Sequence, residues 1–263
     1  MKQIKMLFSM FAASLLVFAA GCQNAQAANA QANTMQVVTV STQTESAASN
    51  ADEVSSGSYS DRDLDASYDE SEAIPVDLSD VSGDYTITAA GVYVLSGTLA
   101  DGSVVVNAGE DDKVQIVLAN ASIHNSDGPA IYAVAADKVF LTAKDGTVNE
   151  LSDSNSYADD AFGNSPDGTI FTRCDLTING AGSLSVDGNY KFGVVGKDDV
   201  VVVNTALSIH SVSDGLVGKD SVSIGSGTVS ITVGGDGIVS ENGDDASLGS
   251  VFIDGGTISI ETG

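Results

Sequence analysis

Short runs rich in β-branched residues recur from residue 92 to the end of the chain, and their spacing constrains the fold more than any other feature. They span residues 92–95, 104–106, 114–118, 139–142, 176–178, 200–203, 222–224 and 251–253. Gly, Asn and Asp separate them, as is typical of short strands joined by tight turns. In one register the runs begin at Val92, Val114, Val139, Leu176, Val200, Val222 and Val251, with spacings of 22, 25, 37, 24, 22 and 29 residues. A base period of roughly 22 residues with inserted loops predicts a solenoid.

The repeat unit indicates which kind of solenoid this is. One unit holds up to three strand-like segments, seen at residues 221–224, 227–233 and 237–240. Apolar residues alternate within the middle segment, at Val229, Ile231 and Val233, so one set of side chains would face a narrow core and the other set water. We therefore expect residues 76–263 to form an all-β, single-stranded parallel β-helix with roughly 22 residues per coil. A β-sandwich is the competing architecture, but its strands would not repeat their local sequence.

Composition narrows the choice of partners. The chain carries 36 Asp and Glu residues against 10 Lys and Arg residues, a formal net charge of −26. Binding a phosphate backbone requires a basic surface, so we expect no nucleic-acid partner. Two cysteines cannot make a disulfide framework, and stability must therefore come from packing or from metal ions.

The N-terminus has the features of an export signal. Lys2 and Lys5 precede an apolar run at residues 6–20 that is too short for a membrane-spanning helix. The run ends in small residues directly before Cys22, which resembles the lipobox of bacterial lipoproteins. We expect residues 1–21 to be removed and Cys22 to be acylated, which would anchor an exported, surface-facing protein to the cell membrane or outer membrane. An ordinary signal peptide cut near residues 25–28 is the alternative. The polar and acidic residues 22–75 predict a disordered tether.

Several motifs of the repeat carry a family resemblance. GKDDVVV at 196–202, GKDSVSI at 218–224 and TRCDLTI at 172–178 share one pattern, and SDG at 126–128 and 213–215 is matched by GDG at 235–237. With GVYVLSGTL at 91–99 and DDKVQIVLANASIHNSDGPAIY at 111–132, residues 85–263 resemble a family of bacterial surface proteins named for a carbohydrate-binding domain. The resemblance implies a right-handed β-helix, similar to pectate lyases, that binds calcium and plant cell-wall polysaccharides such as cellulose and polygalacturonate. A shared fold does not by itself determine the ligand.

Alignment of the coils on Leu176, Val200 and Val222 places acidic residues in columns. One column contains Cys174, Asp198 and Asp220. A second pair, Asp214 and Asp236, lies one coil apart near the opposite end of the short strand. Stacked carboxylates repel one another unless water or a cation separates them, and Ca²⁺ accepts many oxygen ligands in irregular shells. At least one calcium site is therefore predicted among Asp198, Asp199, Asp214, Asp220 and Asp236. The alternative is that these side chains only bond local backbone at the coil corners.

The longest insertion in the repeat is SDSNSYADDAFGNSPDG, at residues 152–168. Long loops on a rigid scaffold are favoured places for binding, and flat aromatic rings can pack against sugar rings. Candidate carbohydrate contacts are Tyr157, Asp159, Asp160 and Phe162 in this loop, together with Tyr190 and Phe192. A disordered acidic insertion is the alternative.

A third column holds Arg173, Lys197 and Lys219 beside the acids. In a pectate-lyase-like enzyme, a base beside calcium would abstract the proton next to a uronate carboxyl group. Cations paired with neighbouring aspartates are the alternative, and we favour it. His124 and His210 occupy similar strand positions, and we expect neither to have a serine or cysteine nucleophile beside it.

Together these features predict non-catalytic, calcium-dependent binding of cell-wall polysaccharide, either an acidic uronan or cellulose, at the bacterial cell surface. A calcium-dependent polysaccharide lyase and a structural surface adhesin are the alternatives. The last motif, GGTISIETG at residues 255–263, has no capping element after it, so we expect the natural chain to continue.

Overall fold

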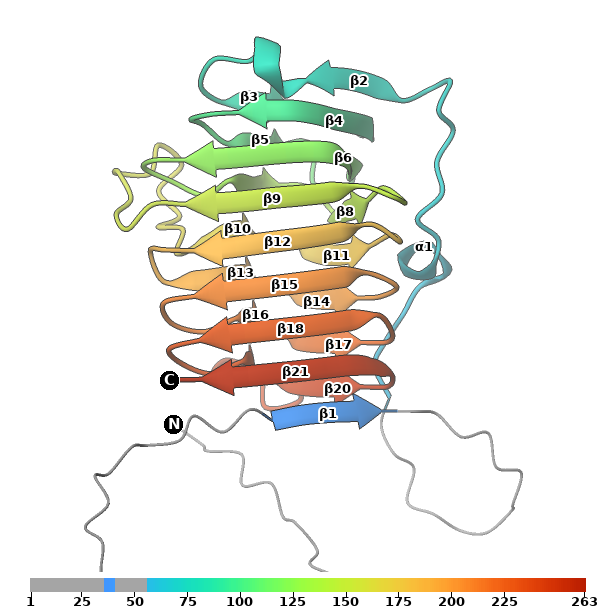
Figure 1. Cartoon of the computed structure of the whole chain (residues 1–263), viewed down its shortest axis with the longest axis vertical. Coiled ribbons are helices and arrows are strands. Elements are labelled where there is room, and N and C mark those ends of the chain that lie inside the picture. The colour runs from blue at the N-terminus through green and yellow to red at the C-terminus, as the bar shows by residue number, and fades with distance from the viewer. Residues whose placement is uncertain (1–35, 41–55) are drawn as a thin grey trace, which may run out of the picture. The chain divides into compact units, whose positions relative to one another are not determined.

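The computed structural model describes residues 36–40 and 56–263, which belong to one compact unit spanning residues 33–263 (Figure 1). The predictions for the signal peptide and for acylated Cys22 lie outside the described residues. Among the residues that are described, no helix is long and apolar enough to cross a membrane.

Parallel strands stack in three faces around one core. The first face contains β2 (Ile74–Asp77), β4 (Gly91–Leu99), β6 (Lys113–Asn125), β8 (Lys138–Ala143), β11 (Asp175–Asn179), β14 (Asp199–Val202), β17 (Ser221–Ile224) and β20 (Ser250–Ile253). The second face contains the C-terminal halves of β4 and β6, then β9 (Val148–Asp153), β12 (Ser183–Gly188), β15 (Ala206–Ser211), β18 (Thr228–Val233) and β21 (Gly256–Thr262). The third face contains β3 (Tyr85–Ile87), β5 (Val104–Asn107), β7 (Ile131–Ala135), β10 (Gly168–Thr172), β13 (Phe192–Gly196), β16 (Leu216–Gly218) and β19 (Ile238–Ser240).

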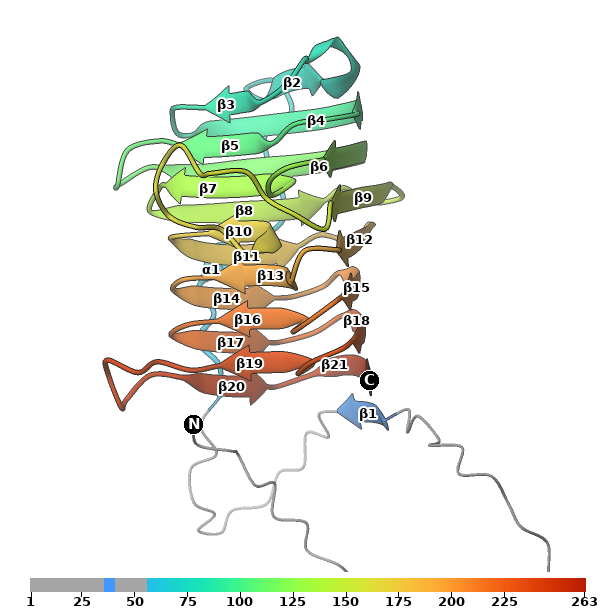
Figure 2. The same ribbon diagram turned by 90° about the vertical axis from the view of Figure 1, so that its left-hand side faces the viewer.

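Each complete coil contributes one strand to each face. β11, β12 and β13 form one coil, and β14, β15 and β16 form the next, stacked directly on it (Figure 2). The predicted all-β parallel β-helix is thereby confirmed. One strand departs from the parallel stack, because β1 (Gln36–Val40) pairs antiparallel with β21.

The pairing register agrees with the predicted one in all coils but the first. Val139, Leu176 and Val200 pair in succession along the first face, as predicted. In the first coil, however, Gly91 pairs with Val114, where the sequence spacing suggested Val92. A shift of one residue reverses the direction of every side chain in a strand. Tyr93 is therefore buried at 7% exposure, and Val92 shares the outward row of Gln115.

The corner between the first and second faces explains the regular Gly and Asn punctuation. In successive coils this corner holds a residue with a positive φ angle between 50° and 102°: Gly97, Asn120, Gly146, Gly180, Asn204, Gly227 and Gly256. Glycine and, less readily, asparagine adopt this left-handed conformation. At Gly180 there is also no room for a side chain, because a Cβ atom would lie 2.2 Å from the carbonyl oxygen of Ala143.

The interior is a narrow column of aliphatic side chains. Ile116, Leu141, Ile178, Val202 and Ile224 are completely buried, whereas Ile253 in the last coil is 37% exposed. Burying each such side chain contributes about 1.5–3 kcal/mol. Cys174 joins this column at 4% exposure, and burial, followed by nearby aspartates, raises its thiol pKa to about 12, so it is not a reactive thiol.

Residues 56–73, here called the strap, differ from the predicted disordered tether. They run along the outer side of the first face from the level of β20 to β2 (Figure 1). At the start of the strap, the backbone N–H of Gly57 and the hydroxyl of Tyr59 donate to Asp254 Oδ2 at 2.8 and 2.7 Å. The strap then forms the short helix α1 (Asp61–Leu64), which Ser60 caps.

The first face requires a cover such as the strap, because its outward side chains are also buried. From β6 to β17 the outward row is no more than 3% exposed; it consists there of Gln115, Phe140, Thr177, Val201 and Ser223. Asp63 of α1 fastens the strap over this row, with Oδ1 lying 2.8 Å from Lys138 Nζ and 2.5 Å from the donor Thr177 Oγ1. Unlike a tether, the strap is therefore part of the packed domain.

Candidate functional site

The insertion between β9 and β10, residues 154–167, is packed against the third face and the adjoining corner. The ring of Tyr157 stacks on that of Tyr190 from the next coil, with centroids 4.3 Å apart and planes inclined by 23°. The hydroxyl of Tyr157 donates to Asp153 Oδ2 at 2.5 Å, and the backbone N–H of Asn189 donates to Asp153 Oδ1 at 2.5 Å. Two of the predicted carbohydrate contacts, Tyr157 and Tyr190, therefore meet, and the carboxylate of Asp153 holds Tyr157 in place.

Burial controls the electrostatics of this half of the site. Asp153 is only 1% exposed, and burial raises the pKa of its carboxyl group, although the hydrogen bonds from Tyr157 and Asn189 partly offset that effect. Burial, and then the neighbouring Asp153 charge, raises the pKa of Tyr157 above its usual range. Burial also raises the pKa of Asp167, which Lys197 and Lys191 partly counteract. The Tyr157 hydroxyl thus remains a proton donor.

A second aromatic group forms where the loop crosses β7 and β10. Tyr132 contacts Phe162 and Phe171 edge to face, at centroid distances of 5.7 and 5.8 Å. The hydroxyl of Tyr132 donates to Asp160 Oδ2 at 2.9 Å and accepts from Asn164 Nδ2 at 2.8 Å. Phe162 is held in place by these contacts and yet is 45% exposed, so it presents a fixed ring to solvent.

The remaining predicted carbohydrate contacts take different positions. Asp160 is a structural group, because backbone N–H groups and Tyr132 outweigh the effect of burial and lower its pKa. Phe192 is half-buried against the apolar row of the third face, and Asp159 is exposed at the loop tip. Tyr132 itself was missed by the sequence analysis. The signal for it was its place in an outward apolar row that includes Val105, Phe171 and Val195.

The five predicted calcium ligands do not converge on one point. Asp199 Oδ1 accepts from Ser221 Oγ at 2.7 Å, and Asp220 Oδ1 accepts from Asn242 Nδ2 at 2.6 Å. At the other corner, Asp214 Oδ1 accepts the backbone N–H of Asp236 at 2.9 Å, which is the local turn role. Burial, then repulsion by Asp220 and Asp199, raises the pKa of Asp198. Within the described ranges, no group of three or more His, Cys, Asp or Glu side chains is placed to hold a metal ion.

The column of cations is occupied by local partners. Arg173 Nη1 donates to Asn164 Oδ1 at 2.7 Å, and Lys219 Nζ lies 3.2 Å from Asp244 Oδ2. Lys197 Nζ lies 5.1 Å from the centre of the Phe171 ring and 3.9 Å from Asp167 Oδ1.

One expectation about the histidines was wrong. His124 Nδ1 lies 2.9 Å from Ser152 Oγ, so a serine does stand beside this histidine. The two residues are neighbours because His124 of β6 and Ser152 of β9 pair in adjacent coils. The sequence does not indicate this pair, because 28 residues separate its members.

Comparisons with known proteins support the family resemblance. A profile of the family described as "Carbohydrate-binding domain-containing protein" matches residues 82–263. A protein of that description from Acetivibrio thermocellus is 33% identical over 124 residues, which cover 47% of this chain and 43% of the relative, so the match spans less than half of that protein. A solved structure described as the polysaccharide lyase-like protein from C. thermocellum, in a gadolinium derivative, is 33% identical with a TM-score of 0.67, covering 71% of this chain and 80% of the other. The chain therefore belongs to the carbohydrate-binding domain-containing protein family.

Proposed function

We propose that the protein binds cell-wall polysaccharide without cleaving it, through the surface formed by residues 154–167 and the neighbouring Tyr190. The observation that carries this proposal is the exposed ring of Phe162, which Tyr132 holds rigidly at the loop surface. A preorganised aromatic ring binds with little ordering cost, and polar groups around it can orient a sugar. The family description supports carbohydrate binding in general.

The arrangement of charges favours binding over cleavage. A lyase needs a base that is free to take a proton from the substrate. Each member of the Arg173, Lys197 and Lys219 column instead contacts a neighbouring side chain. The description "polysaccharide lyase-like" belongs to the structural neighbour, and lyase activity is an outcome that the experiment below can detect.

The finer parts of the proposal rest on the sequence. They are an acidic uronan or cellulose as the ligand, calcium dependence, and display at the bacterial surface through a lipid anchor at Cys22. For calcium, the support is the repulsion among Asp198, Asp199 and Asp220, which a bound cation would relieve.

The experiment is retention on insoluble cellulose and on immobilised polygalacturonate, with and without calcium. Phe162→Ala and Tyr190→Ala should each weaken retention, because each removes an aromatic surface. Val212→Ala is the matched control, since Val212 is an exposed apolar side chain (61%) outside the loop. Retention of both Phe162→Ala and Tyr190→Ala at the level of the parent would refute the proposed surface. Release of unsaturated uronides, measured by ultraviolet absorbance, would show that the protein is a lyase and that the non-catalytic proposal is wrong.

A further inference from the structure

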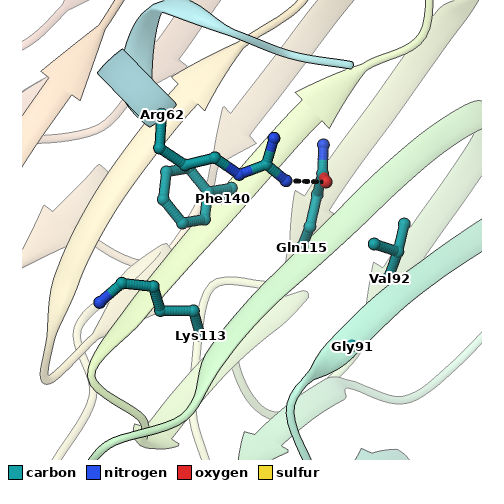
Figure 3. A pocket seen from close by; sticks show the side chains of 6 residues that line it. All are labelled: Arg62, Gly91, Val92, Lys113, Gln115 and Phe140. Carbon is teal, nitrogen blue, oxygen red and sulfur yellow. Dashed lines mark hydrogen bonds between the residues drawn. The ribbon is translucent and has the colours of Figure 1, made fainter. Parts of the chain in front are cut away.

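A pocket of about 160 Å³ lies between the strap and the first face, whereas the loop surface lies on the third face. Its lining comes from α1 and three successive coils: Arg62, Gly91, Val92, Lys113, Gln115 and Phe140 (Figure 3). The family profile begins at residue 82, so Arg62 belongs to a part of the chain that the family match does not include.

Arg62 is fixed in this pocket by neutral groups. Its guanidinium group lies over the Phe140 ring, 5.3 Å from the ring centre, and donates to Gln115 Oε1 at 2.5 Å (Figure 3). It also donates to the backbone carbonyl oxygens of Asp65 and Ser67 at 3.1 and 2.9 Å. A guanidinium group has five N–H donors, so these three bonds leave two donors for a ligand.

The charge of Arg62 has no carboxylate partner within ion-pair distance in the described part of the chain. The exposed carboxylate of Asp65 accepts the backbone N–H of Ser67 at 2.9 Å, and the hydrogen bonds from Ser67, with a smaller effect of the Arg62 charge, lower its pKa. Such a cation is unusual in a chain with 36 acidic and 10 basic residues. Lys113, by contrast, pairs with Asp137, and in Figure 3 its ammonium group points away from the guanidinium group.

The pocket therefore combines one cation that lacks an ion-pair partner with an apolar surface made by Val92 and the methylene groups of Lys113, whereas the Phe140 ring lies beneath Arg62 and is only 2% exposed. A ligand that matches both features has a carboxylate attached to a compact ring. We propose that this pocket binds one acidic sugar residue of a polysaccharide, with its carboxylate on Arg62 and its ring against Val92 and the methylene groups of Lys113. This inference rests on the proposed function for the polymeric nature of the ligand, and it adds a second, charge-selective site to the loop surface.

The location explains how so acidic a protein can retain an acidic polymer. The net charge of −26 repels polyanions at long range, but 0.1 M salt screens most of this repulsion at separations beyond about 10 Å. A guanidinium group that is already oriented can then form paired hydrogen bonds with a carboxylate. The strap holds Arg62 in that orientation through the buried contacts of the adjacent Asp63.

The test compares polygalacturonate with the same polymer after methyl esterification, which removes the charge and keeps the sugar backbone. The parent should bind polygalacturonate more tightly. Arg62→Gln should weaken that binding by about tenfold, to the level of the ester, because losing a hydrogen bond to a charged group typically raises the dissociation constant by about that factor or more. Val92→Glu should do the same by placing a competing carboxylate in the pocket without altering the strap. Lys144→Gln, which removes an exposed cation on the same face, is the control and should leave the preference unchanged.

Urea midpoints equal to that of the parent show that the variants remain folded. Undiminished preference for polygalacturonate in both Arg62→Gln and Val92→Glu would overturn the acidic-sugar site. A parent that binds the two polymers equally would also overturn it while leaving the loop-surface proposal standing. A parent that binds neither polymer nor cellulose would refute the proposed function itself.

Discussion

Replacement of Asp63 by alanine tests whether the strap is an integral part of the fold. Asp63 is 2% exposed, and its carboxylate contacts Lys138 Nζ at 2.8 Å, Thr177 Oγ1 at 2.5 Å and Ser60 Oγ at 2.7 Å. Burial alone would raise the pKa of this carboxyl group, but the hydrogen bonds from Lys138, Thr177 and Ser60 outweigh it and lower the pKa.

The magnitude follows from what the substitution leaves behind. Removing one member of a buried ion pair costs about 3–5 kcal/mol, because the other charge remains without its partner. Here Lys138 keeps a second acid, Asp175, at 4.0 Å and has a side chain 13% exposed, so the cost should fall near the lower limit. We expect Asp63→Ala to lower the free energy of unfolding by about 3 kcal/mol, or the melting temperature by roughly 6–12 °C for a domain of this size. Asp63→Asn should lose less, because it keeps an acceptor for Thr177 or Ser60.

The assay is urea unfolding at pH 7, combined with hydrogen exchange of residues 56–73. The control is Asp61→Asn, which removes an exposed acid from the same helix. Asp63→Ala should also speed exchange in the strap. Identical urea midpoints and strap exchange rates for Asp63→Ala, Asp61→Asn and the parent would refute the conclusion that the strap is fastened there.

Three further outcomes are expected. Burial raises the pKa of four carboxyl groups, those of Asp153, Asp167, Asp175 and Asp198, so these groups bind protons at higher pH in the folded protein than in the unfolded chain. The urea midpoint should therefore rise as the pH falls from 7 toward about 4, and it should fall at lower pH, where Asp63 becomes protonated. A midpoint that increases steadily from pH 4 to 7 would contradict this prediction. Calcium should raise the melting temperature at pH 7, and Asp198→Asn with Asp220→Asn should remove that response; an equal response in this variant and in the parent would exclude the column as the calcium site. Gly57→Ala should lower the free energy of unfolding by about 1–3 kcal/mol, because the added Cβ atom would lie 2.7 Å from Ser223 Oγ. Unchanged hydrogen exchange in the strap would instead show that the strap shifts to accommodate the methyl group.

Much of the fold was predictable because it depends on local patterns. Alternating Val and Ile residues make strands, and a Gly or Asn at each turn permits the left-handed corner. The register of Val139, Leu176 and Val200 could therefore be read from spacing alone. Val92 was misplaced because the register was aligned on the first β-branched residue of each run, whereas Gly91, just before that run, is the residue that pairs with Val114. A bulge between Leu95 and Gly97 shifts the pairing once more, and spacing does not reveal bulges.

The candidate site was predictable only in part. The interruption of the repeat marked residues 154–167, and two predicted rings, Tyr157 and Tyr190, do stack there. The role of Tyr132 could not be read in the same way, because its partner Asp160 is 28 residues distant. The role of Asp153 could be read only in part, because Tyr157 is four residues away but Asn189 is 36 residues distant and meets it only when coils stack. The acid columns were placed in the correct register, but register says nothing about whether carboxylates converge on an ion.

The sequence by itself determined the architecture: a solenoid of parallel strands with corners at Gly and Asn and one long insertion. These features depend on interactions within a coil or between adjacent coils, which a periodic pattern encodes directly. The tertiary structure alone decided the position of the strap, which joins Tyr59 to Asp254 across 195 residues and Asp63 to Thr177 across 114. A polar segment carries no apolar periodicity from which a partner could be inferred, so only the folded face, with its buried outward row, shows that residues 56–73 pack against it.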